Sequence, residues 1–333
     1  MLRGTTPPVR PFKKALSLTP TWSGDRTVNL DFDDRFAPIR AVATVDGANY
    51  ANSGIQADSS SSITVFEPKD TPIEKIVLVG GGNAYPYSVD LTEIASLQGV
   101  EELDFGILRF SESIEILSSL PNLKIIRTGY FNNLFESDGT SKMAGWKSLE
   151  QIYGRGDTTL WYFNELAHLP LKIIELDRSW CSGFEGFENL TTLEIVRIIF
   201  TRNAAAPNLY HFRNLNKLYS LNLTNTSATG SLIDLANCSE LQAVTLTDNS
   251  NISGGGEVVK YMPKLRYLNL DRCGFTQVQL DDLVAQMVEA GNFFTGSGKT
   301  LIVTAQTTGE TFSTAGLANV DMLRNSYGWT VIY

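Results

Sequence analysis

Apolar residues between Leu241 and Asn249 follow an order that predicts a short β-strand. Val244 stands three residues after Leu241, Leu246 follows two positions later, and Asn249 ends the run. Successive side chains of a strand point to opposite faces, so Val244 and Leu246 face a common core and the residue between them faces outward. A terminal asparagine can hydrogen-bond the backbone where the chain turns away. One such coil cannot bury its own apolar face, so the pattern predicts further coils beside it.

The same inward pair recurs at nearly constant spacing over most of the chain. Eight pairs are clear: Leu103/Phe105, Ile126/Thr128, Ile152/Gly154, Ile174/Leu176, Val196/Ile198, Leu221/Leu223, Val244/Leu246 and Leu268/Leu270. Successive pairs are 22 to 26 residues apart, within the roughly 20–29 residues typical of leucine-rich repeats. Three weaker pairs extend the array at its ends: Ile76/Leu78, Leu301/Val303 and Trp329/Val331. We therefore expect an α/β fold, a leucine-rich repeat solenoid with a parallel sheet on its concave face.

The residues that follow the strands predict uneven returns between coils. The position of Asn249 is taken by other residue types elsewhere, at Ser179, Thr201, Thr226 and Cys273. A continuous row of asparagines is therefore not specified. Glycines such as Gly154 and Gly230 interrupt the returns, so we expect short helical or irregular segments on the convex side.

Two segments of different character precede the array. Residues 1–22 contain four prolines, no acidic residue and four basic ones, Arg3, Arg10, Lys13 and Lys14. Proline disfavours a helix there, so we expect an extended basic arm, which is either a solvated tail or a segment that docks on a partner. Short alternating runs across residues 23–70 predict a small β-rich unit or a cap on the first coil. The repeat array then covers residues 71–278, and capping repeats cover residues 279–333.

The C-terminal region predicts helix, strand, helix and strand in that order. Residues 279–288 place apolar side chains on one helical face, and residues 300–304 alternate as a strand does. A second helix is expected from residue 313 through 323, and the chain closes on a short strand. Such an ending would cover the open core of the last coil.

Particular residues make this ending more specific than the repeats. They are Asp281–Val284, Gly291, Leu301–Val303, Ser313, Gly316, Leu317 and Gly328–Val331. Together they resemble the closing cap of leucine-rich repeat proteins found in bacteriophage virions, notably tail-associated and fibre-like proteins, and in related bacterial proteins. The resemblance covers residues 73–333 and implies a virion protein. Residues 291–299, with Phe293 and Phe294, depart from the polar Gly-rich turn of such caps.

Composition narrows the class of protein. Hydrophobic residues make up 43% of the chain, as in globular proteins, and the net charge of −9 argues against a general nucleic-acid surface. We find no apolar run of membrane-spanning length and no secretion signal at the start, so we expect folding in a cytoplasm. Cys181, Cys238 and Cys273 lie in different coils and suit buried filling better than metal or redox chemistry.

Candidate catalytic chemistry is sparse. Residues 296–300 end like a phosphate-binding loop, but Phe293 stands where that motif requires glycine, and a strand rather than a helix follows. His168 and His211 have no nucleophile near them in a recognisable motif. A pair of carboxylates that meet only in space stays open. We therefore expect no enzymatic activity, no metal and no cofactor.

Outward residues of the strands form the candidate binding site. The central coils gather a charged patch with one aromatic member: Arg127, Tyr153, Arg155, Glu175, Asp177 and Arg197. Tyrosine and arginine dominate binding energies at interfaces. Mixed charges favour a polar ligand, such as a glycan or a protein loop, over a polyanion. A face that is merely exposed to solvent also carries mixed charges. The sequence pattern does not distinguish such a surface from a binding site.

Together these features predict a non-enzymatic structural or recognition component of a phage particle, in its tail, baseplate or fibre. Its expected partners are other virion proteins, bound through the arm, and a host surface glycan or protein; nucleic acid and membrane insertion are not expected. Two alternatives stay open. A bacterial cell-surface adhesin would need an export signal, and a carbohydrate-active enzyme would need a clustered acid pair.

Overall fold

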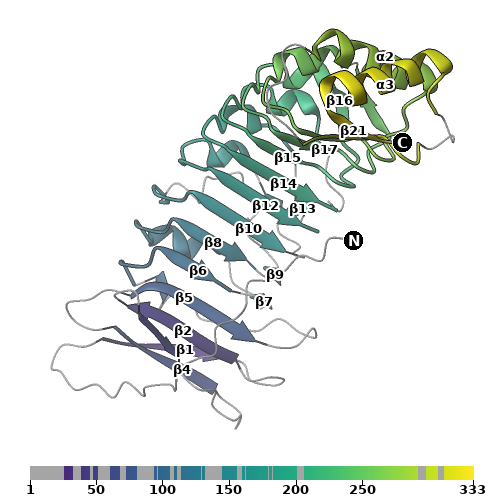
Figure 1. Ribbon diagram of the computed structural model, residues 1–333. Coiled ribbons are helices and arrows are strands. Elements are labelled where there is room, and N and C mark those ends of the chain that lie inside the picture. Colours follow the sequence, from purple (N-terminus) through teal and green to yellow (C-terminus); the bar gives the residue numbers. More distant parts are fainter. Residues whose placement is uncertain are drawn as a thin grey trace.

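The computed structural model describes an elongated stack of coils (Figure 1). The described residues are 26–32, 39–45, 48–51, 61–67, 73–80, 94–95, 97–105, 109–110, 114–128, 130–131, 145–155, 160–161, 163–178, 180–181, 183–200, 206–254, 256–291, 298–306 and 311–333. The basic arm, Ser179, Thr201, Phe293 and Phe294 lie outside the described residues, so the predictions about them are not tested by the structure.

Thirteen strands of the described part form one sheet that runs the length of the stack (Figure 1). In spatial order they are β3 (Ala48–Ala51), β2 (Ile39–Val45), β5 (Ile73–Gly80), β6 (Glu102–Asp104), β8 (Ile125–Thr128), β10 (Gln151–Arg155), β12 (Ile173–Asp177), β14 (Ile195–Ile199), β15 (Ser220–Asn222), β17 (Ala243–Thr245), β19 (Tyr267–Asn269), β20 (Lys299–Ile302) and β21 (Trp329–Ile332). From β5 to β21 every pairing is parallel, whereas β2 pairs antiparallel with β3 and β5.

The register of this sheet confirms the predicted repeat alignment for ten coils. The first inward residues are successive Cα partners in the order Ile76, Leu103, Ile126, Ile152, Ile174, Val196, Leu221, Val244, Leu268 and Leu301. At the last strand the prediction is wrong by two residues, because Leu301 pairs with Val331 and not with Trp329. A two-residue shift keeps a side chain on the same face, so Trp329 and Val331 are both buried and the pattern could not separate them.

The N-terminal stretch contains strands where alternating runs predicted them. β1 (Arg26–Phe32) pairs antiparallel with β4 (Ser61–Glu67), and β2 continues the main sheet beyond β5. The division of the chain at residues 22, 70 and 278 stays a prediction.

The convex side consists of short segments, as the interrupted returns predicted. Six 3₁₀ helices lie there in the described part: η1 (Ile114–Ser119), η2 (Phe163–Leu166), η3 (Phe187–Asn189), η4 (Leu209–Phe212), η5 (Leu232–Leu235) and η6 (Gly256–Tyr261). Three small parallel sheets accompany them: β7 (Arg109–Phe110) with β9 (Tyr130–Phe131), β11 (Leu160–Trp161) with β13 (Trp180–Cys181), and β16 (Thr229–Ser231) with β18 (Asn251–Ser253). These convex strands lack the recurrent inward pair of the main sheet, so the repeat pattern did not locate them.

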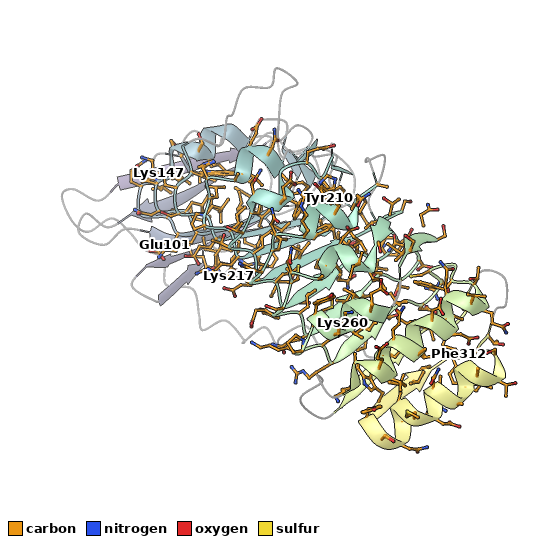
Figure 2. The ribbon with its side chains drawn as sticks, turned by 90° about the horizontal axis from the view of Figure 1, so that it is seen from above. Glu101, Lys147, Tyr210, Lys217, Lys260 and Phe312 are labelled. Atoms are coloured by element: carbon orange, nitrogen blue, oxygen red, sulfur yellow. The ribbon has the colours of Figure 1, made fainter. Side chains whose placement is uncertain are left out.

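Between the sheet and the convex segments, apolar side chains fill a continuous core (Figure 2). Aromatic rings stack from coil to coil on its convex side, where Phe163, Phe187 and Phe212 follow one another with centroids 4.2 and 5.1 Å apart. Burying each such ring contributes about 2–3 kcal/mol to stability. Tyr210 and Lys260, labelled in Figure 2, lie on the outer surface.

Six described coils, from β12 to β20, leave the sheet through the same turn. The residue four positions after the first inward residue has a positive φ of 48° to 62° at Arg178, Phe200, Asn225, Asp248, Arg272 and Ala305. Its backbone N–H still donates to a carbonyl of the next coil, as from Asn225 to Thr247 at 2.9 Å. The left-handed conformation then turns the chain away from the sheet. We call the line of these residues the exit edge.

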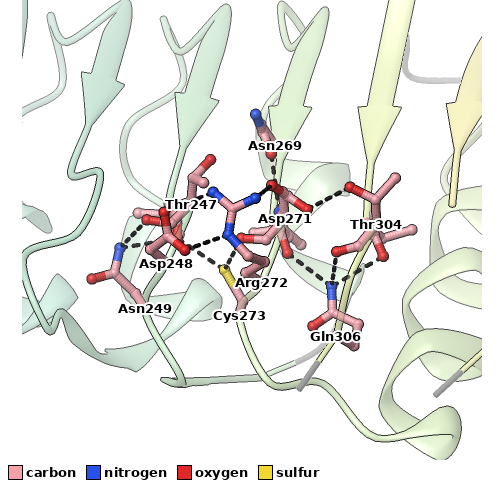
Figure 3. Close-up of polar contacts among 12 residues, drawn as sticks. Thr247, Asp248, Asn249, Asn269, Asp271, Arg272, Cys273, Thr304 and Gln306 are labelled. Atoms are coloured by element: carbon pink, nitrogen blue, oxygen red, sulfur yellow. Dashed lines mark hydrogen bonds and ion pairs between the residues drawn. The ribbon is translucent and has the colours of Figure 1, made fainter. Parts of the chain in front are cut away.

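In the described coils from β15 to β20, the next position satisfies the backbone of the turn, as Figure 3 shows for Asn249, Cys273 and Gln306. Asn249 is fully buried, and its Nδ2 donates to the carbonyl oxygens of Leu223, Leu246 and Thr247. Its Oδ1 accepts from the backbone N–H of Ala228 at 2.7 Å. Two other residue types take over part of this role. Cys273 Sγ donates to Leu246 O, and Gln306 Nε2 donates to Leu270 O and Val303 O.

Two helices close the C-terminal end of the stack, α2 (Gln277–Glu289) and α3 (Thr314–Tyr327). The cap residues singled out in the sequence meet there: the backbone N–H of Ser313 donates to Asp281 Oδ1 at 3.0 Å, and Ser313 Oγ accepts from the N–H of Gly316. A Cβ at Gly316 would lie 1.8 Å from Asp281 Oδ1. A side chain at this position would displace the Asp281 carboxylate that accepts from Ser313, so glycine preserves this contact between α2 and the start of α3.

Candidate functional site

The residues proposed from the sequence lie together on the open face of the sheet. Arg127, Tyr153, Glu175 and Arg197 are cross-strand neighbours in one row across β8, β10, β12 and β14. Arg155 and Asp177 are neighbours in the next row. Neighbouring strands of a sheet are about 4.8 Å apart, so side chains of one row are within contact distance. The side chain of Arg155 lies outside the described part.

One member of this cluster was missed in the sequence. Glu102 lies on β6, and its Oε1 accepts from Lys75 Nζ at 2.8 Å and from Arg127 Nη1. It precedes the inward pair of its strand, whereas the prediction considered only residues between and after the pairs. The arginine is thus held from one side by a carboxylate.

Tyr153 stacks with this arginine. The Arg127 guanidinium carbon lies 4.5 Å from the centre of the Tyr153 ring, and the Tyr153 hydroxyl donates to Gln151 Oε1 at 2.9 Å. Burial raises the pKa of the Tyr153 hydroxyl, Arg127 opposes this, and Glu175 adds to it. The phenol is therefore neutral at physiological pH. Arg127 covers one face of the ring.

Arg197 is held much more loosely. Its Nη1 lies 3.9 Å from Glu175 Oε2, which is beyond hydrogen-bond distance, and 43% of the arginine side chain is exposed. Within the described part of the chain its guanidinium makes no hydrogen bond. Five N–H donors on the open face are thus available to a ligand.

Aliphatic side chains accompany these charges. Ile125, Ile173 and Ile195 stand at the outward position that opens β8, β12 and β14, and all three are half-buried. These isoleucines were not predicted as site residues, because the candidate positions were chosen for polar and aromatic side chains. The cluster is therefore a mixture of aliphatic, aromatic and charged groups, and not a purely polar surface.

The open face changes character towards the C-terminal end. Asn222 and Thr245 continue the row of Arg197, and Asn269 follows them. The side chains of Asn222 and Asn269 bond within the sheet, as where Asn222 Oδ1 accepts from the Thr224 hydroxyl at 2.7 Å. Charge on this face is thus concentrated between β6 and β14.

The parallel sheet, the coil period and the buried residue at the end of each strand decide the class of fold. This is a leucine-rich repeat solenoid. No protein-family model matches the chain, and no curated protein sequence matches it significantly.

Several solved leucine-rich repeat structures are similar to the chain over part of its length. A leucine-rich repeat protein of Leptospira interrogans has 16% identity and a TM-score of 0.47 over 64% of this chain and 58% of that one. An internalin of Listeria monocytogenes has 18% identity and a TM-score of 0.45 over 73% and 77%. The Arabidopsis receptor kinase HAESA, solved with the peptide hormone IDA and the co-receptor SERK1, has 16% identity and a TM-score of 0.49 over 69% and 39%. The chain thus spans less than two thirds of the Leptospira and HAESA proteins.

The histidines of the leucine-rich repeat array lie on its convex side. His168 Nδ1 is 2.9 Å from the Glu165 carbonyl oxygen, and its Nε2 is 3.1 Å from that of Trp146. His211 Nδ1 is 3.5 Å from Glu188 Oε2. The contacts of His168 with Trp146 and of His211 with Glu188 join neighbouring coils.

Cysteine and metal chemistry find little support within the described residues. Burial raises the pKa of the Cys238 and Cys273 thiols to about 12, so both are protonated and unreactive at neutral pH. Groups of three or more His, Cys, Asp or Glu side chains placed to hold a metal ion are absent from this part of the array. Its helices are also too short or too polar to cross a membrane.

The segment that looked like a phosphate-binding loop has a different role at its described end. Lys299 opens β20 and is only 5% exposed. Its Nζ donates to the carbonyl oxygen of Tyr327 at 3.1 Å, at the C-terminus of α3, and burial lowers its pKa. The lysine therefore binds a helix end from inside the cap, which agrees with the rejection of a nucleotide site.

Proposed function

We propose that this leucine-rich repeat chain is a non-enzymatic recognition protein that binds a partner protein on the open face between β6 and β14. The observation that carries the proposal is Arg197, whose guanidinium has no hydrogen-bond partner in the described part and lies in the sheet beside half-buried isoleucines. An arginine whose N–H donors are unused and whose neighbours are aliphatic is typical of the centre of a protein interface. Free energy of binding comes there from apolar contact and from new hydrogen bonds to the arginine.

A protein ligand suits this face better than a glycan. Sugars bind to exposed aromatic faces and polar groups, but the ring of Tyr153 is covered on one side by Arg127. Ile173 and Ile195 offer branched aliphatic groups that match apolar side chains. A host surface protein is therefore a better candidate than a host glycan.

The finer part of the proposal places the chain in a phage particle, in its tail, baseplate or fibre. Its support is the resemblance of the C-terminal cap, where Asp281, Ser313 and Gly316 meet in one contact. In this proposal the chain assembles in the host cytoplasm and binds other virion proteins through residues 1–22. A bacterial cell-surface adhesin is the second candidate, because the same open face would serve it equally well.

The open-face proposal is tested by removing its two main side chains. The variant Tyr153→Ala with Arg197→Ala should keep the melting temperature within about 2 °C, because neither residue belongs to the core. Partner proteins recovered with the wild type from producing cells should decrease at least tenfold with the variant, as quantified by mass spectrometry. Lys217→Ala, an exposed change in the turn before β15, should recover them normally. If the wild type, the double variant and Lys217→Ala recover equal amounts of the partner proteins, the proposed binding face is contradicted.

The phage proposal is tested by the arm. Deleting residues 1–14 should leave the repeat array folded, as judged by circular dichroism, because the described coils share one continuous apolar core. The same deletion should remove the protein from purified particles in a complementation experiment. Particles that carry the deleted protein at the normal level would exclude docking through this arm.

A further inference from the structure

A second surface, separate from the open face, lies on the exit edge of the central coils. The fold places a left-handed residue at six described turns, and at five of them its N–H bonds to the next coil before the chain turns away. The residue type is not imposed. Asn225 and Asp248 are residue types that tolerate positive φ. Two of the other turns carry Phe200, with a φ of 54°, and Arg178, with a φ of 58°. Phenylalanine and arginine are not among the residue types that tolerate this conformation.

Phe200 is unfavourable in this position for two reasons. A bulky residue at positive φ is strained, and 44% of this side chain is exposed to water. A buried role does not account for it, since its backbone bond to Thr224 O would form with any residue. Asparagine or glycine would satisfy the turn with less strain. The phenylalanine is therefore not explained by the stability of the fold.

Arg178 is equally unexplained by the fold. Its guanidinium carbon lies 6.0 Å from the centre of the Phe200 ring, at the outer limit of a cation–π contact. No ion pair to this exposed side chain occurs among the described residues. Its backbone N–H donates to Ile199 O at 2.8 Å, which again does not depend on the side chain.

The arginine at the same turn two coils beyond Asn225 provides an internal comparison (Figure 3). Arg272 donates to both carboxylate oxygens of Asp248, and its Nη1 lies 2.7 Å from Asp271 Oδ2. One turn geometry thus holds a neutralised arginine at one place and an uncompensated arginine beside an exposed phenylalanine at the other.

We propose that Phe200 and Arg178, the exit-edge pair, form a docking point for a segment of a partner protein that carries a carboxylate next to an apolar side chain. The carboxylate pairs with the Arg178 guanidinium, and the apolar side chain covers the Phe200 ring. Charge complementarity favours this occupant, since the guanidinium is the uncompensated charge of the pair. A polyanion is disfavoured, because the chain has a net charge of −9 and Asp177 adjoins Arg178.

The test uses the full chain and a displayed library of random dodecapeptides as the probe. Peptides are selected on the wild type, and their binding is then compared with Arg178→Gln, Phe200→Asn and the control Arg272→Gln. We expect selected peptides to carry an acidic residue beside an aromatic or aliphatic one. Either exit-edge variant should weaken them at least tenfold, while the control binds them as the wild type does.

A stability measurement separates docking from unfolding. Phe200→Asn should keep or raise the melting temperature, because asparagine suits the left-handed turn, and still lose the peptides. The proposal is overturned if no peptide is selected, if the selected peptides lack acidic residues, or if both exit-edge variants bind them as tightly as the wild type. It is also overturned if Phe200→Asn loses binding together with its folded structure.

Discussion

Asn249 illustrates which single residues a sequence pattern can assign in this protein. Its position, five residues after Val244, predicted a side chain that bonds the backbone at the turn, and the structure confirms this. Gln306 has the same offset from Leu301 and fills the same role, yet it was missed because glutamine is not the residue that the repeat pattern prescribes. Side-chain chemistry that substitutes for a consensus residue becomes visible only when the register is known.

Replacing Asn249 with alanine should therefore destabilise the array strongly. The change leaves the N–H groups of Thr226 and Ala228 without their buried acceptor, and each unsatisfied group costs about 1–3 kcal/mol. It also removes one of the two donors to the carbonyl oxygens of Leu223 and Leu246. We expect a loss of about 3 kcal/mol or more in urea denaturation. Asn237→Ala, an exposed asparagine of the preceding return, should change stability by less than about 0.5 kcal/mol. A loss below about 1 kcal/mol at Asn249 would mean that water replaces its hydrogen bonds.

At the scale of elements, the period of apolar residues predicted the long sheet well and the convex side poorly. Ten strands have the predicted register because Leu, Ile and Val recur at one offset. The slip at β21 arose because Trp329 and Val331 are both apolar and face the same way. On the open face, the pattern found the row of Arg127 and Arg197 but not Glu102, because pairing across strands depends on side-chain geometry.

The ion pair between Asp248 and Arg272 gives a pH prediction at this scale, since it joins two neighbouring exit turns. The hydrogen bond from Arg272 lowers the pKa of the Asp248 carboxyl below its ordinary value of 3.8. A lowered acid pKa stabilises the folded state above pH 3.8, and this contribution is lost as the pH falls through the folded pKa.

Asp248→Asn should therefore reduce stability at pH 7 by less than about 1 kcal/mol, because both partners are partly exposed. The difference from the wild type should shrink when urea denaturation is repeated near pH 3. A difference that stays constant between the two pH values would show that the charge of Asp248 does not contribute.

For the whole molecule, the stacked arrangement limits how far a local change can travel. Each coil contacts mainly its two neighbours, so the stability of a solenoid is close to a sum of coil and interface contributions. The C-terminal cap is attached through α2 and β20, far along the sheet from the open-face cluster on β8 to β14. This separation predicts that the cap and the proposed binding face respond independently.

Gly316→Val tests this independence. The added side chain would collide with Asp281 Oδ1, which lies 1.8 Å from the position of a Cβ, and would displace this carboxylate from the Ser313 N–H at the start of α3. Hydrogen exchange followed by mass spectrometry should accelerate in α2, α3, β20 and β21. The amides of β8, β10 and β12 should exchange at the wild-type rate, because several intact coils lie between them and the cap. Leu317→Ala, a change at an exposed neighbour on α3, should leave all of these rates unchanged. Acceleration along the entire sheet in Gly316→Val would instead mean that the array opens as one cooperative unit, and the binding face would then depend on an intact cap.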